Sequence, residues 1–354
     1  MALAHDTSGH AESAVDRKQS LVRRLIAKPE FGPFVLLVIE LVVFTSINPD
    51  FLSPLNISNT LVFSVELGLI ALAMTLLMTA GEFDLSVGAV FGFSPIVMWT
   101  LFNQGVMPLE LSFLVAIVMA SLIGLVNGLF VTRLKIPSFL VTLGMLLVVR
   151  GTALYVTDGF PQRTWKAGDQ WIATLLVGDF SNIDFFGLFT LHLGGFRIYM
   201  SLFWFIAVAV VFWYILTQTK FGNWIQASGG NPSAARARGV NVNATKVALF
   251  MLCSAMAAFA GIISSIRTSA ANPNSGTGYE LEVIAMVVIG GTALMGGRGT
   301  IVGTVLGVFI LRVMRNGIVM IGVPGLAYNI FIGAIILGMM ALHYGLERRH
   351  QAGT

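Results

Sequence analysis

A series of long apolar segments, separated by short polar ones, most constrains the fold of this chain. A helix needs about 20 mainly apolar residues to cross a bilayer. Ten segments approach that length: Phe31–Ile47, Leu61–Ala80, Val87–Phe102, Leu109–Val131, Phe139–Val156, Ile198–Leu216, Ala244–Ile266, Leu281–Leu294, Ile301–Met314 and Leu326–His343. Only 11% of the 354 residues are charged, against about 25% in soluble proteins. The sequence therefore predicts an all-α integral membrane protein with about ten transmembrane helices.

Three of these segments are short or rich in glycine, namely Val87–Phe102, Leu281–Leu294 and Ile301–Met314. A broken or re-entrant helix is tolerated at membrane depth only where protein or water surrounds it. We expect such elements here, and a merger of these segments would leave eight or nine spans.

A weak internal repeat accompanies these segments. A shift of 215 residues, from 81 to 296, aligns two sets of glycines: Gly81, Gly88 and Gly92 with Gly296, Gly303 and Gly307. Internal repeats are common in transporters. With 38 glycines in the chain, a chance alignment is the alternative.

The distribution of charge predicts the topology. We expect a cytoplasmic N-terminal tail at residues 1–30, a transmembrane domain at 31–343 and a cytoplasmic C-terminal tail at 344–354. Ten spans with a cytoplasmic N-terminus place a polar loop at 218–243 on the same side. Most of the 21 Lys and Arg residues then lie inside, as the positive-inside rule requires. The loop at 157–197, on the other side, is long enough for a small interfacial helix.

The polar loop at 218–243 carries basic residues and no acidic one between Thr219 and Val242. Gly229-Gly230 is expected to break the chain, and proline suits the first position of a helix that Gly239 would end. The residues of this candidate contact surface are Gly229, Gly230, Asn231, Pro232, Ser233, Ala234, Ala235, Arg236 and Gly239. The pattern predicts a short helix, 232–238, along the cytoplasmic face between flexible joints. A solvated connecting loop is the alternative.

An acidic motif, Gly81–Gly88, joins two apolar segments and contains Glu82, Asp84 and Ser86. One interpretation is structural, because a side-chain oxygen of Asp84 or Ser86 can cap the helix that follows. The other is that Glu82 and Asp84 pair with a basic group across a moving interface. Paired catalytic carboxylates are a weaker third interpretation, because no other feature of an active site accompanies them.

Several polar residues fall inside predicted spans, where charges are costly and usually face a cavity or a partner. Glu66 and Asn127 are candidates for a translocation pathway, with packing as the alternative. Arg150 is a candidate for the pathway or for gating, although its side chain could also reach back to the membrane surface. Glu40 is expected at a subunit or lipid-facing edge.

Other chemistries lack support in the sequence. There is one cysteine, and no two of the five histidines have metal-ligand spacing, so neither a metal site nor a metalloenzyme is expected. The glycine-rich stretch Gly290–Gly303 lacks the Gly-Lys-Ser/Thr ending of a phosphate-binding loop and is instead expected to pack closely. The basic residues border apolar segments, which argues against nucleic-acid binding.

The polar motifs together resemble the ribose/xylose/arabinose-type permeases of ABC importers. Ser233-Ala-Ala, followed by three residues and Gly239, resembles the Glu-Ala-Ala-x-x-x-Gly loop of such permeases, with serine in place of glutamate. The other matching stretches are Glu82–Gly88, Asn127-Gly128, Lys135–Gly144, Arg150-Gly151, Phe221-Gly222, Gly229–Ala235, Gly239–Val242 and Val288–Thr292. The resemblance covers about residue 56 to the C-terminus.

The resemblance implies a permease in a bacterial inner membrane that pairs with a second permease subunit, in a homodimer or a heterodimer. It also implies a cytoplasmic ATPase that uses ATP and a periplasmic or extracellular binding protein that delivers the solute. The segment Pro232–Gly239 would transmit the motion of the ATPase. We expect no directly bound cofactor and no enzymatic activity in this chain, because it carries no ATP-binding motif.

Two alternatives belong to other classes. An ion-coupled secondary transporter or facilitator for a small polar solute would favour more buried ionisable residues, and it gives no reason for the short helix. An intramembrane enzyme would need a catalytic set at membrane depth, which the sequence does not contain. The solute itself, a monosaccharide or related polyol, is not specified by the permease sequence.

Overall fold

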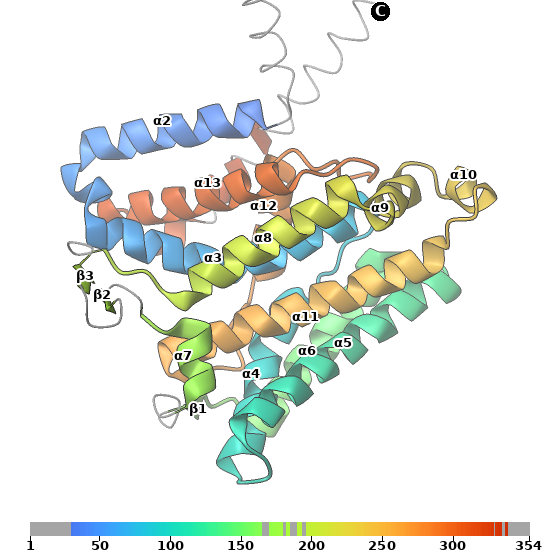
Figure 1. Ribbon diagram of the computed structural model, residues 1–354, viewed down its shortest axis with the longest axis horizontal. Coiled ribbons are helices and arrows are strands. Elements are labelled where there is room, and N and C mark those ends of the chain that lie inside the picture. The colour runs from blue at the N-terminus through green and yellow to red at the C-terminus, as the bar shows by residue number, and fades with distance from the viewer. Residues whose placement is uncertain are drawn as a thin grey trace, which may run out of the picture.

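The computed structural model describes residues 30–164, 170–179, 182–184, 190–192, 196–328, 330–334, 337 and 338. Most of its long helices share one general direction (Figure 1). The predicted tails at 1–30 and 344–354 lie outside the described residues except for Glu30, as does much of the last predicted span.

Among the described residues, six helices are long and apolar enough to cross a bilayer: α3 (Pro54–Thr79), α5 (Leu109–Arg133), α6 (Ser138–Thr157), α8 (Met200–Gln218), α11 (Val242–Thr268) and α13 (Ile301–Met320). Two shorter apolar helices are α2 (Phe31–Ile47) and α4 (Val87–Asn103). These helices confirm the all-α, multi-pass prediction. The ninth predicted segment is longer than expected and forms a full span, because the helix continues past Met314 through the polar residues Arg315 and Asn316.

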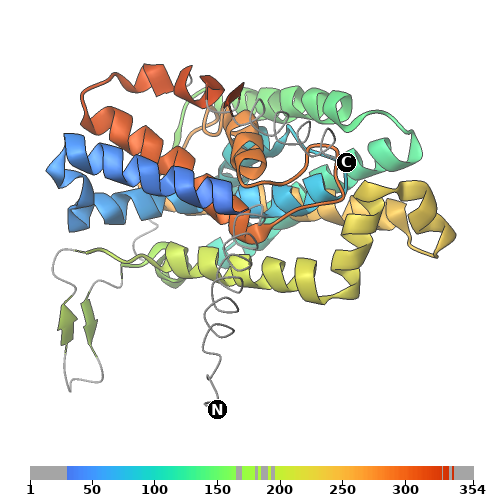
Figure 2. The ribbon, with the colours of Figure 1, turned by 90° about the horizontal axis from the view of Figure 1, so that it is seen from above.

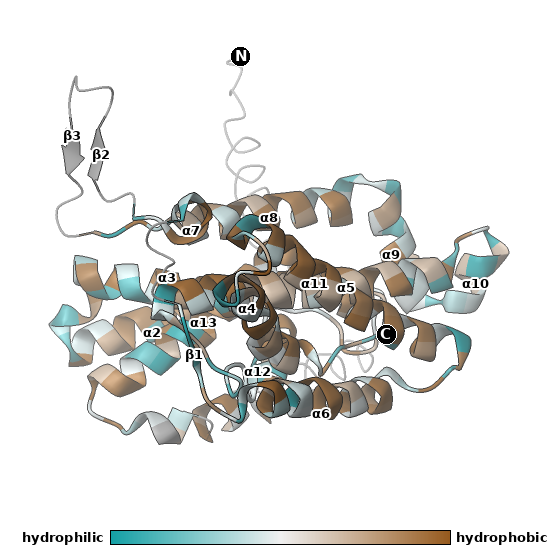
Figure 3. Cartoon of the chain, turned by 90° about the horizontal axis from the view of Figure 1, so that it is seen from below, coloured by the Kyte–Doolittle hydropathy of each residue, from teal (hydrophilic) through white to brown (hydrophobic). Residues whose placement is uncertain are grey.

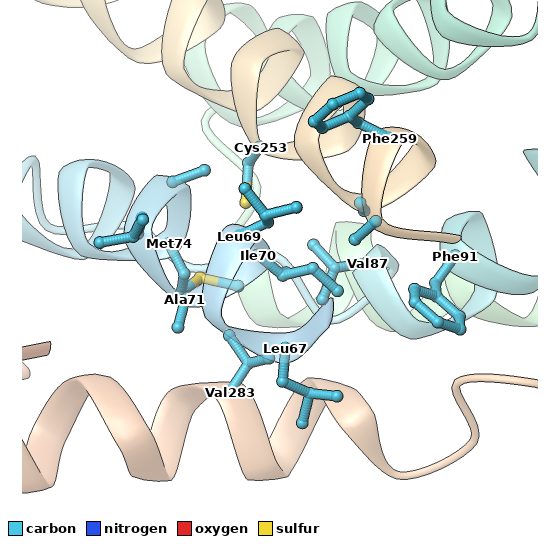
Figure 4. Close-up of a cluster of buried hydrophobic side chains, with 14 of the residues drawn as sticks. Leu67, Leu69, Ile70, Ala71, Met74, Val87, Phe91, Cys253, Phe259 and Val283 are labelled. Carbon is cyan, nitrogen blue, oxygen red and sulfur yellow. The ribbon is translucent and has the colours of Figure 1, made fainter. Parts of the chain in front are cut away.

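Helix α3 lies at the centre of the molecule, and 89% of its most apolar window is buried. Its side chains Leu67, Leu69 and Ile70 are fully buried, with Cys253 of α11 and Val283 of a later helix close by (Figure 4). In the corresponding windows of α6 and α8, only 17% and 22% of the residues are buried. Both helices are coloured mostly as hydrophobic (Figure 3), and their exposed residues include Leu147 of α6 and Val210 of α8, so we assign their exposed faces to lipid.

The eighth predicted segment does not span the membrane. It forms α12 (Tyr279–Ile289), whose 11 residues reach about 17 Å, whereas the hydrocarbon core is about 30 Å thick. Near its start, Gly276 and Glu280 lie against Gly88 in the first turn of α4. The N-terminal ends of α4 and α12 therefore meet inside the protein, which confirms the prediction of broken helices.

Short elements occupy the two ends of the molecule. Helices α9 (Lys220–Gly230) and α10 (Pro232–Ala237) lie at one, which we call the α10 end (Figure 1). The other, the strand end, carries four antiparallel strands, the helix α7 (Trp171–Val177) and the 3-10 helices η1 (Pro49–Leu52) and η3 (Gly325–Ala327). The strands pair as β1 (Gln162–Arg163) with β4 (Ala270–Ala271), and as β2 (Asn182–Asp184) with β3 (Thr190–His192). In Figure 2, the β2–β3 hairpin and the α9–α10 segment project from opposite sides.

Candidate functional site

The predicted short helix is present as α10. Pro232 occupies its first turn, and the Asn231 Oδ1 atom accepts hydrogen bonds from the Ala234 backbone N–H at 3.0 Å and the Ser233 hydroxyl at 2.7 Å. The chain leaves the helix through Gly239 at a φ of +83°, which glycine adopts readily. Ser233, Ala234 and Arg236 are exposed, whereas Ala235 is buried.

Gly229 and Gly230 end α9 and pack against two other loops. A Cβ atom on Gly229 would lie 2.6 Å from the Gly297 nitrogen. One on Gly296 would lie 2.8 Å from the Gly81 Cα atom, and one on Gly297 would lie 2.9 Å from the Gly230 Cα atom. We call these five residues the glycine junction. Gly229 is therefore a close packing contact and not the flexible joint that the sequence predicted.

The glycine junction connects the base of α10 to both broken-helix regions. Gly81 belongs to the loop between α3 and α4, and Gly296 and Gly297 belong to the turn between α12 and α13. A hydrogen bond from the Gly297 N–H to the Thr79 carbonyl oxygen, at 2.8 Å, joins the turn between α12 and α13 to the end of α3. A displacement of α10 would thus reach the ends of α3 and α12 through backbone contacts.

Glu82 forms an ion pair in the same region. Its Oε1 atom lies 2.5 Å from the Lys246 Nζ atom of α11, and both side chains are 14% exposed. The predicted pairing of an acidic residue with a basic group is thus observed for Glu82. It ties the loop after α3 to the first turns of α11, which follow α10 along the chain.

Asp84 has hydroxyl and amide partners instead of a basic one. Its Oδ1 atom accepts hydrogen bonds from the Ser86 backbone N–H at 2.8 Å and the Ser86 hydroxyl at 2.5 Å. The Asn127 amide donates to the Ser86 hydroxyl oxygen at 3.0 Å. All three side chains are fully buried. The predicted cap is not formed, because neither Asp84 nor Ser86 accepts a hydrogen bond from the first N–H groups of α4. Asp84 and Asn127 instead hold the turn that precedes the helix.

Arg150 of α6 holds the meeting point of the broken helices. Its Nη1 atom donates hydrogen bonds to the carbonyl oxygens of Pro273 at 2.5 Å and Ser275 at 2.7 Å. Its Nη2 atom donates to the Gly88 carbonyl oxygen at 3.1 Å. The guanidinium therefore points into the protein and does not reach for the membrane surface. Glu40 is 8% exposed, so its side chain does not face lipid, and its place at a subunit edge stays a prediction.

A cavity of about 470 Å³ opens at the strand end. Parts of α3, α11, α12 and α13 line it, and Glu66 is among its residues. The Glu66 Oε1 atom accepts from the Arg267 Nε atom at 2.8 Å and lies 2.7 Å from Arg267 Nη2. The guanidinium of Arg267 lies 4.5 Å from the centre of the Phe63 ring. Of the predicted pathway residues, Glu66 alone lines this cavity.

Most of the residues that line the cavity were not among the predicted pathway residues. The polar residues Asn59 and Thr60 follow Asn56 by three and four positions on α3, and Arg312 and Asn316 are four apart on α13. Polar residues at intervals of three and four in an apolar helix indicate a polar face. That periodicity was the available signal. Among the residues that the structure describes, no three His, Cys, Asp or Glu side chains are grouped to hold a metal ion.

Comparison with known proteins places these features in a family. Residues 56–340 match the family model described as the permease component of the branched-chain amino acid transport system. The chain belongs to this permease family. The matched range contains α10, the glycine junction, the Arg150 contacts and the whole cavity.

Individual members of the permease family align over most of their length. The ribose import permease protein RbsC of Bacillus subtilis (strain 168) is 36% identical over 87% of this chain and 90% of its own. The galactose/methyl galactoside import permease protein MglC of Escherichia coli (strain K12) is 35% identical over 88% and 93%. The probable ABC transporter permease protein YphD of the same strain is 32% identical over 95% of each chain.

Proposed function

We propose that this chain is the membrane-spanning permease subunit of an ATP-driven ABC importer for a monosaccharide or related polyol. The observation that carries the proposal is the alignment with sugar import permeases over nearly nine tenths of the chain. The cavity at the strand end agrees with this function, because its lining combines amide, hydroxyl and aromatic side chains. The chain is the transport subunit, and ATP hydrolysis belongs to a partner.

Three kinds of partner complete the importer: a cytoplasmic ABC ATPase, a second permease subunit and a solute-binding protein. We assign the ATPase to the α10 end, where Ser233, Ala234 and Arg236 offer an exposed surface. Basic residues gather at this end, including Lys220 and Arg238. Under the positive-inside rule it is cytoplasmic, together with both tails. The cavity then opens toward the side from which the binding protein delivers solute.

Uptake of labelled D-ribose and D-galactose into proteoliposomes tests the transport function. The full chain, its partner ATPase and its binding protein should together accumulate one of these sugars only when ATP is supplied on the α10 side. Omission of either partner should abolish accumulation. Uptake by this chain alone, driven by a proton or sodium gradient, would contradict the proposal and favour a secondary transporter.

Cysteine cross-linking tests the assignment of α10. Ala234→Cys and Ala237→Cys place a thiol on the exposed face of α10, and either should cross-link to the ATPase. Ala235→Cys is the matched control, because the Ala235 side chain is 3% exposed and its thiol should not react. The native Cys253 is fully buried and should contribute no background. Failure of both exposed positions to cross-link in an active complex would remove α10 from the interface.

A further inference from the structure

We propose that the cavity at the strand end is a solute-binding site in the permease itself. It takes one uncharged polyhydroxylated molecule of monosaccharide size, whose hydroxyl groups bind Asn316 and Glu66. The inference rests on the proposed function and adds a binding site, two residues and a rule of selection by charge. The volume of the cavity, about 470 Å³, lies within the range of roughly 300–1,000 Å³ that is usual for small-molecule sites.

Asn316 offers a fixed hydrogen-bond acceptor to the cavity. Its Nδ2 group donates to the Asn56 Oδ1 atom at 2.8 Å and to the Thr60 hydroxyl oxygen at 2.9 Å. Asn56 must present its oxygen there, because its own Nδ2 group donates to the Phe51 carbonyl oxygen at 2.7 Å. Both N–H groups of Asn316 are therefore used, and its Oδ1 atom remains to accept from a solute hydroxyl group.

Glu66 supplies a second acceptor whose charge is already balanced. Both contacts from Arg267 reach the Oε1 atom of Glu66, which leaves Oε2 available for a hydroxyl group. Arg267 is itself held over the Phe63 ring, so the pair is fixed on one wall of the cavity. A carboxylate that is paired in this way can accept a hydrogen bond without requiring a cationic solute.

Aromatic side chains provide the complementary apolar surface. Phe63, Phe91 and Tyr279 line the cavity, and the Phe91 and Tyr279 rings pack edge to face with centroids 5.1 Å apart. The C–H face of a sugar ring is apolar, whereas its hydroxyl groups project from the rim. A site with aromatic walls and a few fixed polar groups matches both features.

The charges around the cavity select against cations. Glu66 is paired with Arg267, and Glu282, behind the wall, is paired with Arg312 at 3.5 Å. Arg315, over the Tyr328 ring at 5.0 Å, adds a further positive charge. The ammonium group of an amino acid would meet this excess positive charge, and the Glu66 carboxylate is already neutralised by Arg267. A neutral polyol incurs no such penalty.

Protection of a single thiol from labelling tests the site directly. Thr268→Cys introduces an exposed cysteine into the cavity lining, and Gln104→Cys introduces one at the same end but outside the cavity. In the full chain in lipid nanodiscs, without ATPase or binding protein, millimolar D-ribose or D-galactose should slow maleimide labelling of Thr268→Cys at least threefold. Labelling of Gln104→Cys should not change. L-Leucine and ethylenediamine should protect neither position.

A second variant connects protection to the acceptor. Asn316→Leu removes the Oδ1 atom and should raise the sugar concentration for half-protection about tenfold, which corresponds to about 1.4 kcal/mol. No protection by any neutral polyol, or equal protection by L-leucine, would overturn the inference. Stronger protection by ribose 5-phosphate would also overturn it, since Arg315 would then select anions. ATP-dependent sugar uptake in the complete system would leave the proposed function intact in each case.

Discussion

The two ends of this molecule are built by opposite means. At the α10 end, five glycines from three segments bring backbones into contact and leave no room for side chains. At the strand end, side chains from α3, α11 and α13 line a cavity, and some of them hydrogen bond to one another. Close-packed backbone transmits displacement with little loss, whereas a polar cavity can exchange its own hydrogen bonds for those of a solute. The contrast predicts that the α10 end moves as a unit and that the strand end recognises the solute.

The largest effect is expected between the two ends, at Arg150. Arg150→Met would leave three carbonyl oxygens without their donor in the protein interior. Hydrogen bonds to charged groups contribute about 1.5–3 kcal/mol each, so a loss of several kcal/mol is expected. Thermal unfolding in detergent measures it. Arg150→Lys, which keeps the charge, should recover part of the lost stability. If Arg150→Met were as stable as the native chain, the contacts of Arg150 would not hold the broken helices together.

A smaller effect is expected at the glycine junction. Gly296→Ala adds a Cβ atom 2.8 Å from the Gly81 Cα atom and should cost about 1–3 kcal/mol through overpacking, in addition to backbone strain. Gly239→Ala is the matched control, because its φ of +83° is nearly the same as that of Gly296 but nothing lies within 4 Å. The difference in unfolding midpoint between the two variants isolates the crowding. No difference would mean that the junction is loosely packed.

The ion pair beside the junction should contribute less. Glu82 and Lys246 each retain contact with solvent, so a coupling of about 1 kcal/mol or less is expected. A double-mutant cycle of Glu82→Gln and Lys246→Met in thermal unfolding measures it, and the coupling should fall as salt is added. A coupling energy that does not change with salt would indicate that the pair is shielded from solvent, despite the 14% exposure of each side chain.

The smallest effect on stability is expected on the exposed face of α10. Ser233→Glu restores the residue that the resembling loop carries and should change the unfolding free energy by no more than about 0.5 kcal/mol. If this face contacts the ATPase, the same substitution should change the affinity of the purified chain for that partner. Lys220→Glu changes a charge on the neighbouring α9, and its effect on the same affinity is the control. Loss of stability without a change in affinity would make α10 a structural element only.

Local features of this chain were predictable, and contacts between distant residues were not. The long apolar segments, the broken helices and α10 follow from composition, segment length and the positions of proline and glycine. The packing of Gly229 could not be predicted, because Gly81 and Gly297 come from other segments. The pairing of Asn316 with Asn56 joins residues 260 positions apart, and only the spacing of polar residues on each helix hinted at it.

The three carbonyl contacts of Arg150 also bear on how the chain is assembled in the membrane. Two of its acceptors, at Pro273 and Ser275, lie 123 and 125 positions further along the chain. During synthesis α6 therefore precedes the segment that carries two of the three acceptors of its arginine, and a guanidinium that lacks partners at membrane depth is costly. The guanidinium must therefore stay hydrated or within the insertion machinery until the segment with Pro273 and Ser275 has been made. Chains truncated before residue 273 should consequently be cleared by membrane quality-control proteases.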